Sequence, residues 1–190
     1  MGHKDIKIIK ELFPELNEIK NEKLRNGVAE VWYRVWISSS WEKIEEVPHP
    51  LLPGVSLISH IKVVFKAVKE VAKIISEMHN IKINTDLLYA AALLHDVSIL
   101  LEYERKKGKI VHSKIGELIP HGYYGAHIAL EVGLPIELAH LIITHTILSP
   151  IEPKMIEGII LHYVDFCDAD VIRALNKLNL FLAKIYKGKY

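Results

Sequence analysis

The stretch from Leu87 to Leu101 is apolar except for Ser98 and the adjacent pair His95 and Asp96. A run this apolar is typical of a helix buried in a protein core, and we expect that helix to continue through the pair. Burying an imidazole beside a carboxylate costs free energy unless something binds both groups. A bound metal ion would meet this requirement, so the run predicts a buried helix that carries a metal site.

A second helix is predicted from Leu57 to Met78, where apolar residues recur in steps of four and three. His60 borders this apolar stripe, because it lies next to Ile61, with Leu57 three residues before it and Val64 four residues after it. We therefore expect a second inward-facing imidazole. The predicted stripe consists of Leu57, Ile61, Val64, Val68, Val71, Ile75 and Met78.

Asp165 is a further candidate ligand near the end of the chain. It follows Leu161 by four residues and precedes Ala169 by four, so its carboxylate faces inward on a helical model. The chain thus has two imidazoles and two carboxylates that would converge from three helices, a donor set that suits a divalent ion such as Mn, Fe, Co, Ni, Mg or Zn. The four groups are His60, His95, Asp96 and Asp165.

The order of these residues resembles that of the HD-domain metal-dependent phosphohydrolases, which have a His, then a His-Asp pair, then a distant Asp. Here the pattern is His60, then His95-Asp96 in Ala-Ala-Leu-Leu-His-Asp, then Asp165 in His-Tyr-Val-Asp-Phe-Cys-Asp. The resemblance spans roughly Val55 to Ala174 and implies an all-α, HD-domain-like helical bundle. It also implies that Asp96 is both a metal ligand and a catalytic proton acceptor.

A subset of that family holds two metal ions through extra histidines, and the resemblance extends to His121 and His145. His121 opens the segment His-Gly-Tyr-Tyr-Gly-Ala, and Pro120 before it predicts a place in the first turn of a short helix. His145 ends the next apolar helix, 136–147, where the family often has a His-His pair but this chain has Thr146. This mismatch favours one bound ion, while a second ion stays open.

The residues after the His-Asp pair depart from the family pattern. Many hydrolytic members continue as His-Asp-x-Gly-Lys, and some nucleotidases carry a Glu three residues after the Asp, whereas Ser98 and Ile99 stand here. A phosphate-neutralising lysine must then come from elsewhere, or the activity differs or is lost. The candidate replacements are Lys106, Lys107 and Lys109, although a charged run around a glycine is more often a solvated loop.

The resemblance implies metal-assisted hydrolysis of a phosphomonoester or phosphodiester, with a nucleotide or related small molecule as substrate. The alternative is a catalytically degenerate domain that binds a nucleotide or a protein partner, which the missing Gly-Lys favours. A further alternative is a single-strand nuclease, which would need a basic groove lined with aromatic residues. The formal net charge of +1 argues against a broad nucleic-acid footprint.

The length of 190 residues, half of them hydrophobic, suits a single domain. We expect a helical extension over 1–54, an HD core over 55–174 and the end of the last helix over 175–190. In the extension, Trp32 and Trp36 recur at helical spacing with Ala29 and Tyr33. These aromatics are expected to pack an extra helix onto the domain, while a homodimer surface or a base-stacking wall is the alternative.

No uninterrupted apolar stretch reaches the ~18 residues that a bilayer-crossing helix needs, and the start of the chain lacks the apolar core of a secretory signal. We therefore expect a cytoplasmic protein without a membrane partner. The segment from Gly108 to Pro120 is expected to form a short hairpin or a lid. The remaining histidines are expected to be structural: His49, His79, His112, His127, His140 and His162. Asp168 and Asp170 are expected on a helix surface or behind a ligand.

Overall fold

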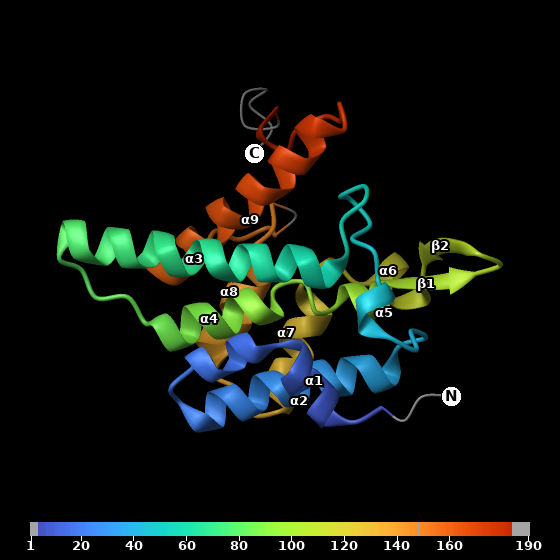
Figure 1. Ribbon diagram of the computed structural model, residues 1–190, viewed down its shortest axis with the longest axis horizontal. Coiled ribbons are helices and arrows are strands. Elements are labelled where there is room, and N and C mark those ends of the chain that lie inside the picture. The colour runs from blue at the N-terminus through green and yellow to red at the C-terminus, as the bar shows by residue number, and fades with distance from the viewer. Residues whose placement is uncertain (1–3, 148, 184–190) are drawn as a thin grey trace.

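Helices make up nearly all the regular structure of residues 4–147 and 149–183, which the computed structural model describes. The predicted all-α class is therefore confirmed, with one small hairpin added (Figure 1). The α-helices are α1 (Ile6–Leu12), α2 (Glu22–Ser38), α3 (Leu57–His79), α4 (Thr85–Leu94), α5 (Ile99–Glu102), α6 (Lys114–Leu118), α7 (Tyr123–Glu131), α8 (Ile136–Thr144) and α9 (Ile156–Leu175). Two 3-10 turns, η1 (Pro14–Glu18) and η2 (Ile44–Glu46), and strands β1 (Tyr103–Lys106) and β2 (Lys109–His112) complete the described elements.

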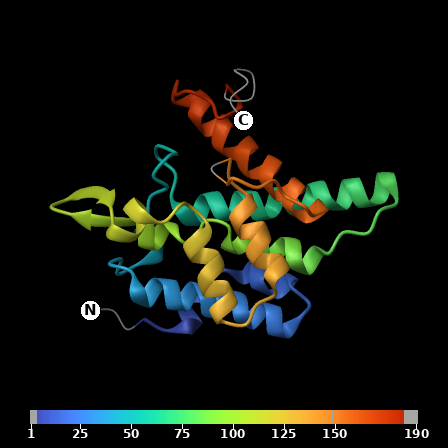
Figure 2. The same cartoon turned by 180° about the vertical axis from the view of Figure 1, so that it is seen from behind.

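Helix α4 lies at the centre of the fold because it is apolar on nearly every face. It packs against α3 and α9 on one side and against α2 on another, as Figure 1 shows. Helices α7 and α8 pack on each other, α7 also contacts α2, and α8 also contacts α4 and α9 (Figure 2). The end of α4 is therefore enclosed by helices from both halves of the chain.

Helix α3 follows the predicted boundaries closely. The Ser56 side chain accepts a hydrogen bond from the backbone N–H of Ser59, which caps the start of the helix, and Asn80 ends it in a left-handed conformation. Most of the predicted stripe packs into the core, but the prediction for Met78 is wrong, since this residue is 77% exposed. The end of α3 extends past the neighbouring helices (Figure 1), and Met78 lies there, whereas Ile75 one turn earlier still packs against the core.

The predicted continuous helix over the apolar run is wrong at the His-Asp pair. Helix α4 ends at Leu94, the chain turns through residues 95–98, and α5 starts at Ile99. The backbone N–H of Val97 donates to the carbonyl of Leu94, a three-residue step that replaces the α-helical spacing. The break turns both polar side chains toward one point, which a straight helix would not allow for adjacent residues.

The aromatic residues of the N-terminal region pack α2 onto the rest of the domain, as expected. Trp32 is fully buried, and its indole Nε1 donates to the backbone carbonyl of Leu93, at 2.8 Å. Trp36 and Trp41 are also buried, and Nε1 of Trp41 donates to the carbonyl of Tyr103. The alternative of a dimer or base-stacking surface is wrong for these three indoles. The domain division at residue 54 stays a prediction.

A hairpin follows α5 and projects from the helices (Figure 1). Strands β1 and β2 pair antiparallel with Tyr103 opposite His112, and the turn residues Lys107 and Gly108 have φ of 50° and 76°. Two positive φ angles are typical of the tight turns that join hairpin strands. A hairpin is therefore present, but its bounds differ from the prediction: it spans residues 103–112, so the segment from Gly108 to Pro120 contains only its second strand and continues into α6. Among the described residues, no helix is long and apolar enough to cross a membrane.

Candidate metal centre

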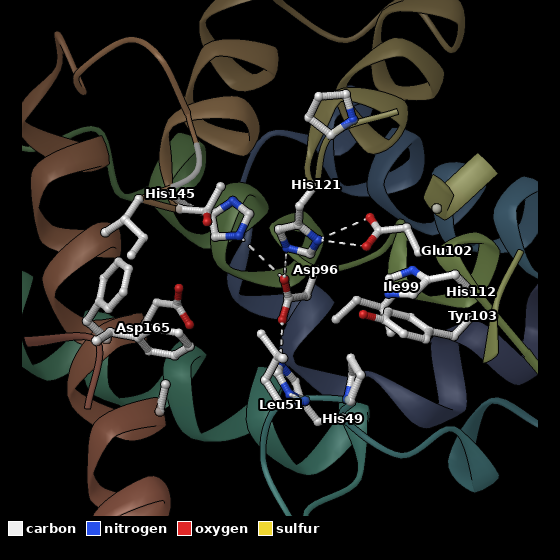
Figure 3. Close-up of a pocket in the computed structure, with 18 of the residues that line it drawn as sticks. His49, Leu51, Asp96, Ile99, Glu102, Tyr103, His112, His121, His145 and Asp165 are labelled. Atoms are coloured by element: carbon white, nitrogen blue, oxygen red, sulfur yellow. Dashed lines mark hydrogen bonds and ion pairs between the residues drawn. The ribbon is translucent and has the colours of Figure 1, made fainter. Parts of the chain in front are cut away.

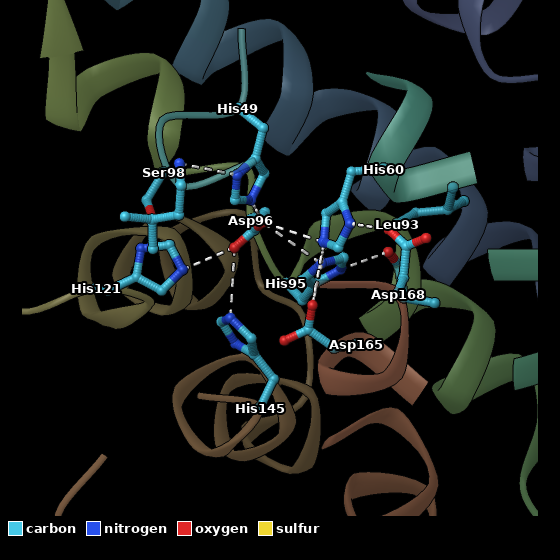
Figure 4. A network of polar contacts seen from close by, with 12 residues as sticks. His49, His60, Leu93, His95, Asp96, Ser98, His121, His145, Asp165 and Asp168 are labelled. Atoms are coloured by element: carbon cyan, nitrogen blue, oxygen red, sulfur yellow. Dashed lines mark hydrogen bonds and ion pairs between the residues drawn. The ribbon is translucent and has the colours of Figure 1, made fainter. Parts of the chain in front are cut away.

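The structure brings all six predicted ligands to one place (Figure 4). His60 lies in the first turn of α3, the His-Asp pair lies in the turn after α4, and Asp165 lies in the middle of α9. His145 follows the end of α8, as predicted. His121 precedes α7 by two residues, so its predicted place in the first helical turn is wrong.

The first cluster consists of His60, His95 and Asp165. Nε2 of His60 lies 3.0 Å from Oδ1 of Asp165 and 3.2 Å from Nε2 of His95. Nε2 of His95 lies 3.8 Å from the same Asp165 oxygen. Both imidazoles are almost completely buried, so their Nε2 atoms face each other and Asp165 rather than water, while the Asp165 side chain stays 14% exposed.

The second cluster consists of Asp96, His121 and His145. Oδ1 of Asp96 lies 2.7 Å from Nε2 of His121 and 3.4 Å from Nε2 of His145. The place of His121 depends on Gly122, which has φ of 81° and whose added Cβ would lie 2.8 Å from the carbonyl oxygen of Ile142. Any other residue at this position would therefore strain the backbone and displace His121.

One carboxylate faces both clusters. While Oδ1 of Asp96 faces His121 and His145, its Oδ2 lies 3.6 Å from Nε2 of His60 and 3.6 Å from Nε2 of His95. Figure 4 shows Asp96 between the two groups of imidazoles. A carboxylate in this position can bind two cations at once, one through each oxygen, whereas the sequence favoured a single ion.

The four histidines of the two clusters are oriented so that their Nε2 lone pairs point toward the centre of the site. Each Nδ1 lies at hydrogen-bond distance from an oxygen that can only accept, so Nδ1 carries the proton and donates. Such bonds fix the tautomer of metal-binding histidines, and the donor set therefore fits divalent ions. The partners are Asp168 for His60 at 2.7 Å, the Ala92 carbonyl for His95 at 2.8 Å, Glu102 for His121 at 3.0 Å and the Ile142 carbonyl for His145 at 2.6 Å.

His49 also lies in the centre, which corrects its prediction as a structural loop residue. Its Nε2 lies 3.1 Å from Oδ2 of Asp96. Its Nδ1, however, accepts a hydrogen bond from the backbone N–H of Leu51, so in neutral His49 the proton is on Nε2 and is donated to Asp96. His49 therefore has the tautomer opposite to that of the other four histidines and orients Asp96 instead of offering a lone pair. No helical periodicity marked this residue, because it lies between two prolines in a loop.

Glu102 is a second residue of the centre that the sequence did not indicate. It is only 7% exposed, and its carboxylate accepts hydrogen bonds from the Ser98 hydroxyl at 2.6 Å and from Nδ1 of His121. Ser98, which stands where the family pattern has glycine, thus supports the carboxylate that orients His121. The available signal was a single charge at the end of the apolar run. Asp168 has the expected role behind a ligand, since it orients His60.

The charges of the centre stabilise each other. Burial alone would raise the pKa of Asp96, but the adjacent His95 and the hydrogen bond with His121 hold it well below its usual value. Burial alone would lower the pKa of His60, yet hydrogen bonds with Asp165 and Asp168 raise it to about 10. His95 has no such carboxylate partner at Nδ1, and burial lowers its pKa to about 4.

A cavity of about 430 Å³ opens beside the two clusters (Figure 3). Asp96, His121, His145 and Asp165 contribute to its wall, and most of the remaining wall is apolar or aromatic. None of the described residues that line it is a lysine or an arginine. The candidate phosphate-binding residues Lys106, Lys107 and Lys109 do not line the cavity and lie exposed in the hairpin.

Comparison with known proteins places the chain in a family. Residues 53–170 match the family model of the HD domain, so the chain belongs to this family. It is also 30% identical over 172 residues to the dihydroneopterin 2',3'-cyclic phosphate phosphodiesterase of Methanocaldococcus jannaschii, a match that covers 81% of this chain. The match spans 66% of the length of that relative. No solved structure matches the chain significantly.

Proposed function

We propose that the protein is a divalent-metal-dependent phosphohydrolase that cleaves a small phosphodiester at a two-metal centre. The position of Asp96, with one oxygen toward each cluster of imidazoles, carries this proposal. Membership of the HD domain family and the phosphodiesterase name of a relative support it.

The proposed ligands divide into two sets that share Asp96. His60, His95 and Asp165 would hold the first ion, and His121 and His145 would hold the second. When bound, two divalent ions supply Lewis acidity toward a phosphoryl oxygen and make a water molecule more acidic. Imidazole and carboxylate donors suit Mn, Fe, Co, Ni, Mg and Zn, so the proposal covers these six ions.

The residues around the ligands keep them ready to bind. Asp168 and Glu102 hold the protons of His60 and His121 on Nδ1, away from the centre. His49 donates to Oδ2 of Asp96 and fixes the plane of this carboxylate. Both Asp96 oxygens face imidazole nitrogens, which favours its role as a shared ligand; its additional role as a proton acceptor stays a prediction.

The chemistry of the cavity wall favours a diester over a monoester. A phosphomonoester carries close to two negative charges near neutral pH, whereas a phosphodiester carries one. Since the described lining contains no lysine or arginine, the ions would have to neutralise the phosphate alone. The wall itself adds the carboxylates of Asp96, Glu102 and Asp165, so a second substrate charge would be repelled.

The test is to strip the protein of metal, reload it with each of the six ions, and assay guanosine 2',3'-cyclic phosphate, bis(p-nitrophenyl) phosphate and p-nitrophenyl phosphate. We expect hydrolysis of the diesters in preference to the monoester. Asp96→Asn should lower kcat by at least about a hundredfold, whereas Asp5→Asn should not, because Asp5 caps α1 and asparagine can replace it as a cap. A protein that holds two ions and cleaves none of these esters would contradict the proposal and favour the nucleotide-binding alternative.

A further inference from the structure

We infer that Tyr103 and His112, paired across the hairpin, form the subsite that binds a planar nitrogen heterocycle of the substrate. This inference rests on the proposed phosphodiester hydrolysis and names its substrate class: a singly charged phosphodiester that carries a heterocyclic ring.

The two rings are held together by the hairpin. Tyr103 and His112 are direct partners in the register of β1 and β2, and their ring centroids lie 4.4 Å apart with an interplanar angle of 38°. Directly opposed side chains in an antiparallel pair stabilise each other, most of all when they are aromatic. The pair therefore forms one composite aromatic surface instead of two independent side chains.

The hairpin is anchored at the point where this pair lies. Nε1 of Trp41 donates to the backbone carbonyl of Tyr103 at 2.9 Å, and the N–H of Ser113 donates to the carbonyl of Glu102 at 2.8 Å. Both bonds join the base of the hairpin to the helical core. A surface fixed in this way loses little conformational freedom when a ligand packs on it, which favours binding.

The pair adjoins the proposed metal centre. Both residues line the cavity, and Tyr103 directly follows Glu102, whose carboxylate orients His121. Figure 3 shows Tyr103, His112 and Ile99 on the same side of Asp96 as Glu102, with the Tyr103 hydroxyl directed into the cavity. His112 is exposed, whereas Tyr103 is half-buried, so the pair stands where the cavity meets solvent. A phosphate bound near Asp96 would thus place its organic substituent against these rings.

The chemistry of this wall fits a heterocycle better than a sugar or an alkyl chain. Aromatic faces stack on planar rings, and the cavity volume of about 430 Å³ suits a small ligand. The Tyr103 hydroxyl has no hydrogen-bond partner among the described residues, so it can bind a polar ring atom. Burial raises the pKa of this hydroxyl, and the negative charges of Glu102 and Asp96 raise it further, so it remains a donor at neutral pH.

The experiment compares two cyclic phosphodiesters that share the reacting group. Guanosine 2',3'-cyclic phosphate has a heterocycle, and glycerol 1,2-cyclic phosphate has none. We expect Tyr103→Leu to raise KM for the guanosine ester about tenfold, as loss of one stacking partner does, and to leave KM for the glycerol ester within about twofold. His112→Leu should act in the same direction. Equal effects on both esters, or none on either, would overturn the subsite.

One further variant separates the contribution of the Tyr103 ring from that of its hydroxyl, and a second serves as a control. Tyr103→Phe keeps the ring and removes the hydroxyl, so any change in KM that it shares with Tyr103→Leu belongs to the hydrogen bond. Tyr163→Leu is the matched control, because Tyr163 is 67% exposed on α9 and does not line this cavity. Metal content and melting temperature of each variant show whether the fold is kept. If Tyr103→Leu does not fold, the comparison is made with Tyr103→Phe and His112→Leu.

Failure of the proposed function is distinguishable from failure of the subsite. If no ester is cleaved, calorimetry of guanosine 2',3'-cyclic phosphate with the metal-loaded protein replaces the kinetic assay. A roughly tenfold weaker Kd in Tyr103→Leu than in the wild type would support the subsite and reject hydrolysis. Cleavage of both esters with the same KM in the wild type and all variants would support hydrolysis and reject the subsite.

Discussion

The Nε2 atoms of His60 and His95 lie 3.2 Å apart, although each ring has its Nδ1 proton committed to an oxygen on its other side. Two lone pairs therefore face each other, with the Asp165 carboxylate beside them. This arrangement is repulsive unless a positive charge lies among the three atoms. Either a proton on Nε2 of His60 or a metal ion can supply this charge, which links the raised pKa of His60 to the proposed metal site.

We predict two divalent ions per chain after stripping and reloading. His95→Ala should abolish binding at the first cluster, and His145→Ala should leave one ion bound, because only the Asp96 carboxylate faces the histidines of both clusters. Metal analysis of each purified variant gives the stoichiometry, with His127→Ala as the control, since this histidine is exposed on α7. A wild type that holds a single ion lost in His95→Ala but not in His145→Ala would establish the one-metal alternative.

Asp168 and Glu102 should affect different ions. Loss of a carboxylate that orients a metal-binding histidine commonly weakens metal affinity about 10–100-fold. We therefore expect Asp168→Asn to weaken binding of the ion held by His60, and Glu102→Gln to weaken binding of the ion held by His121. Titrations of the apoprotein with Mn²⁺ would resolve the two steps. If both variants weaken the same binding step, the assignment of the two carboxylates to different ions is wrong. Glu137→Gln on α8 serves as a surface control.

Metal binding should release a proton from His60 and should strengthen with rising pH. Its pKa is raised to about 10 in the metal-free protein, so at pH 8 the ring is protonated and an ion must displace that proton. The stability that this protonated ring adds to the metal-free fold is complete below its ordinary pKa of 6.5 and is lost as pH rises through about 10.

Calorimetry at pH 8 in buffers of different ionisation enthalpy measures the number of protons released. We expect about one proton to be released when an ion binds at the first cluster. Asp168→Asn removes one of the hydrogen bonds that raise this pKa and should therefore reduce the number. Metal binding without proton release at pH 8 would show that His60 is neutral in the apoprotein.

Trp32 should contribute strongly to the stability of the fold. Its fully buried indole fills the contact between α2 and α4 and donates to the Leu93 carbonyl, two residues before His95. Trp32→Ala should cost about 3–5 kcal/mol in the free energy of unfolding. Trp32→Phe keeps most of the packing but leaves the carbonyl without this donor, and should cost about 1–3 kcal/mol. Denaturant titration with Tyr163→Ala as the exposed control measures both values.

The helical class, the extent of α3 and the ordered set of candidate ligands were accessible from the sequence. The step of four and three between Leu57 and Val68 reports which side of α3 is buried, because a helix face is a local property of the chain. The same spacing identified His60 and Asp165 as inward-facing. It failed at Met78, where the helix continues beyond its neighbours, because periodicity does not show where the packing partner ends.

The arrangement of the centre was decided by tertiary structure alone. His49 and Glu102 contact Asp96 and His121 through a loop and a helix end, whose places depend on how distant segments pack. The shared role of Asp96 depends on the turn that interrupts the apolar run, a break that its uniform hydrophobicity concealed. The sequence by itself determined which residues could bind metal, since donor chemistry and helical face are local. Only the fold decided that their atoms meet in two clusters around one carboxylate, since that distance is set by contacts among helices far apart in the chain.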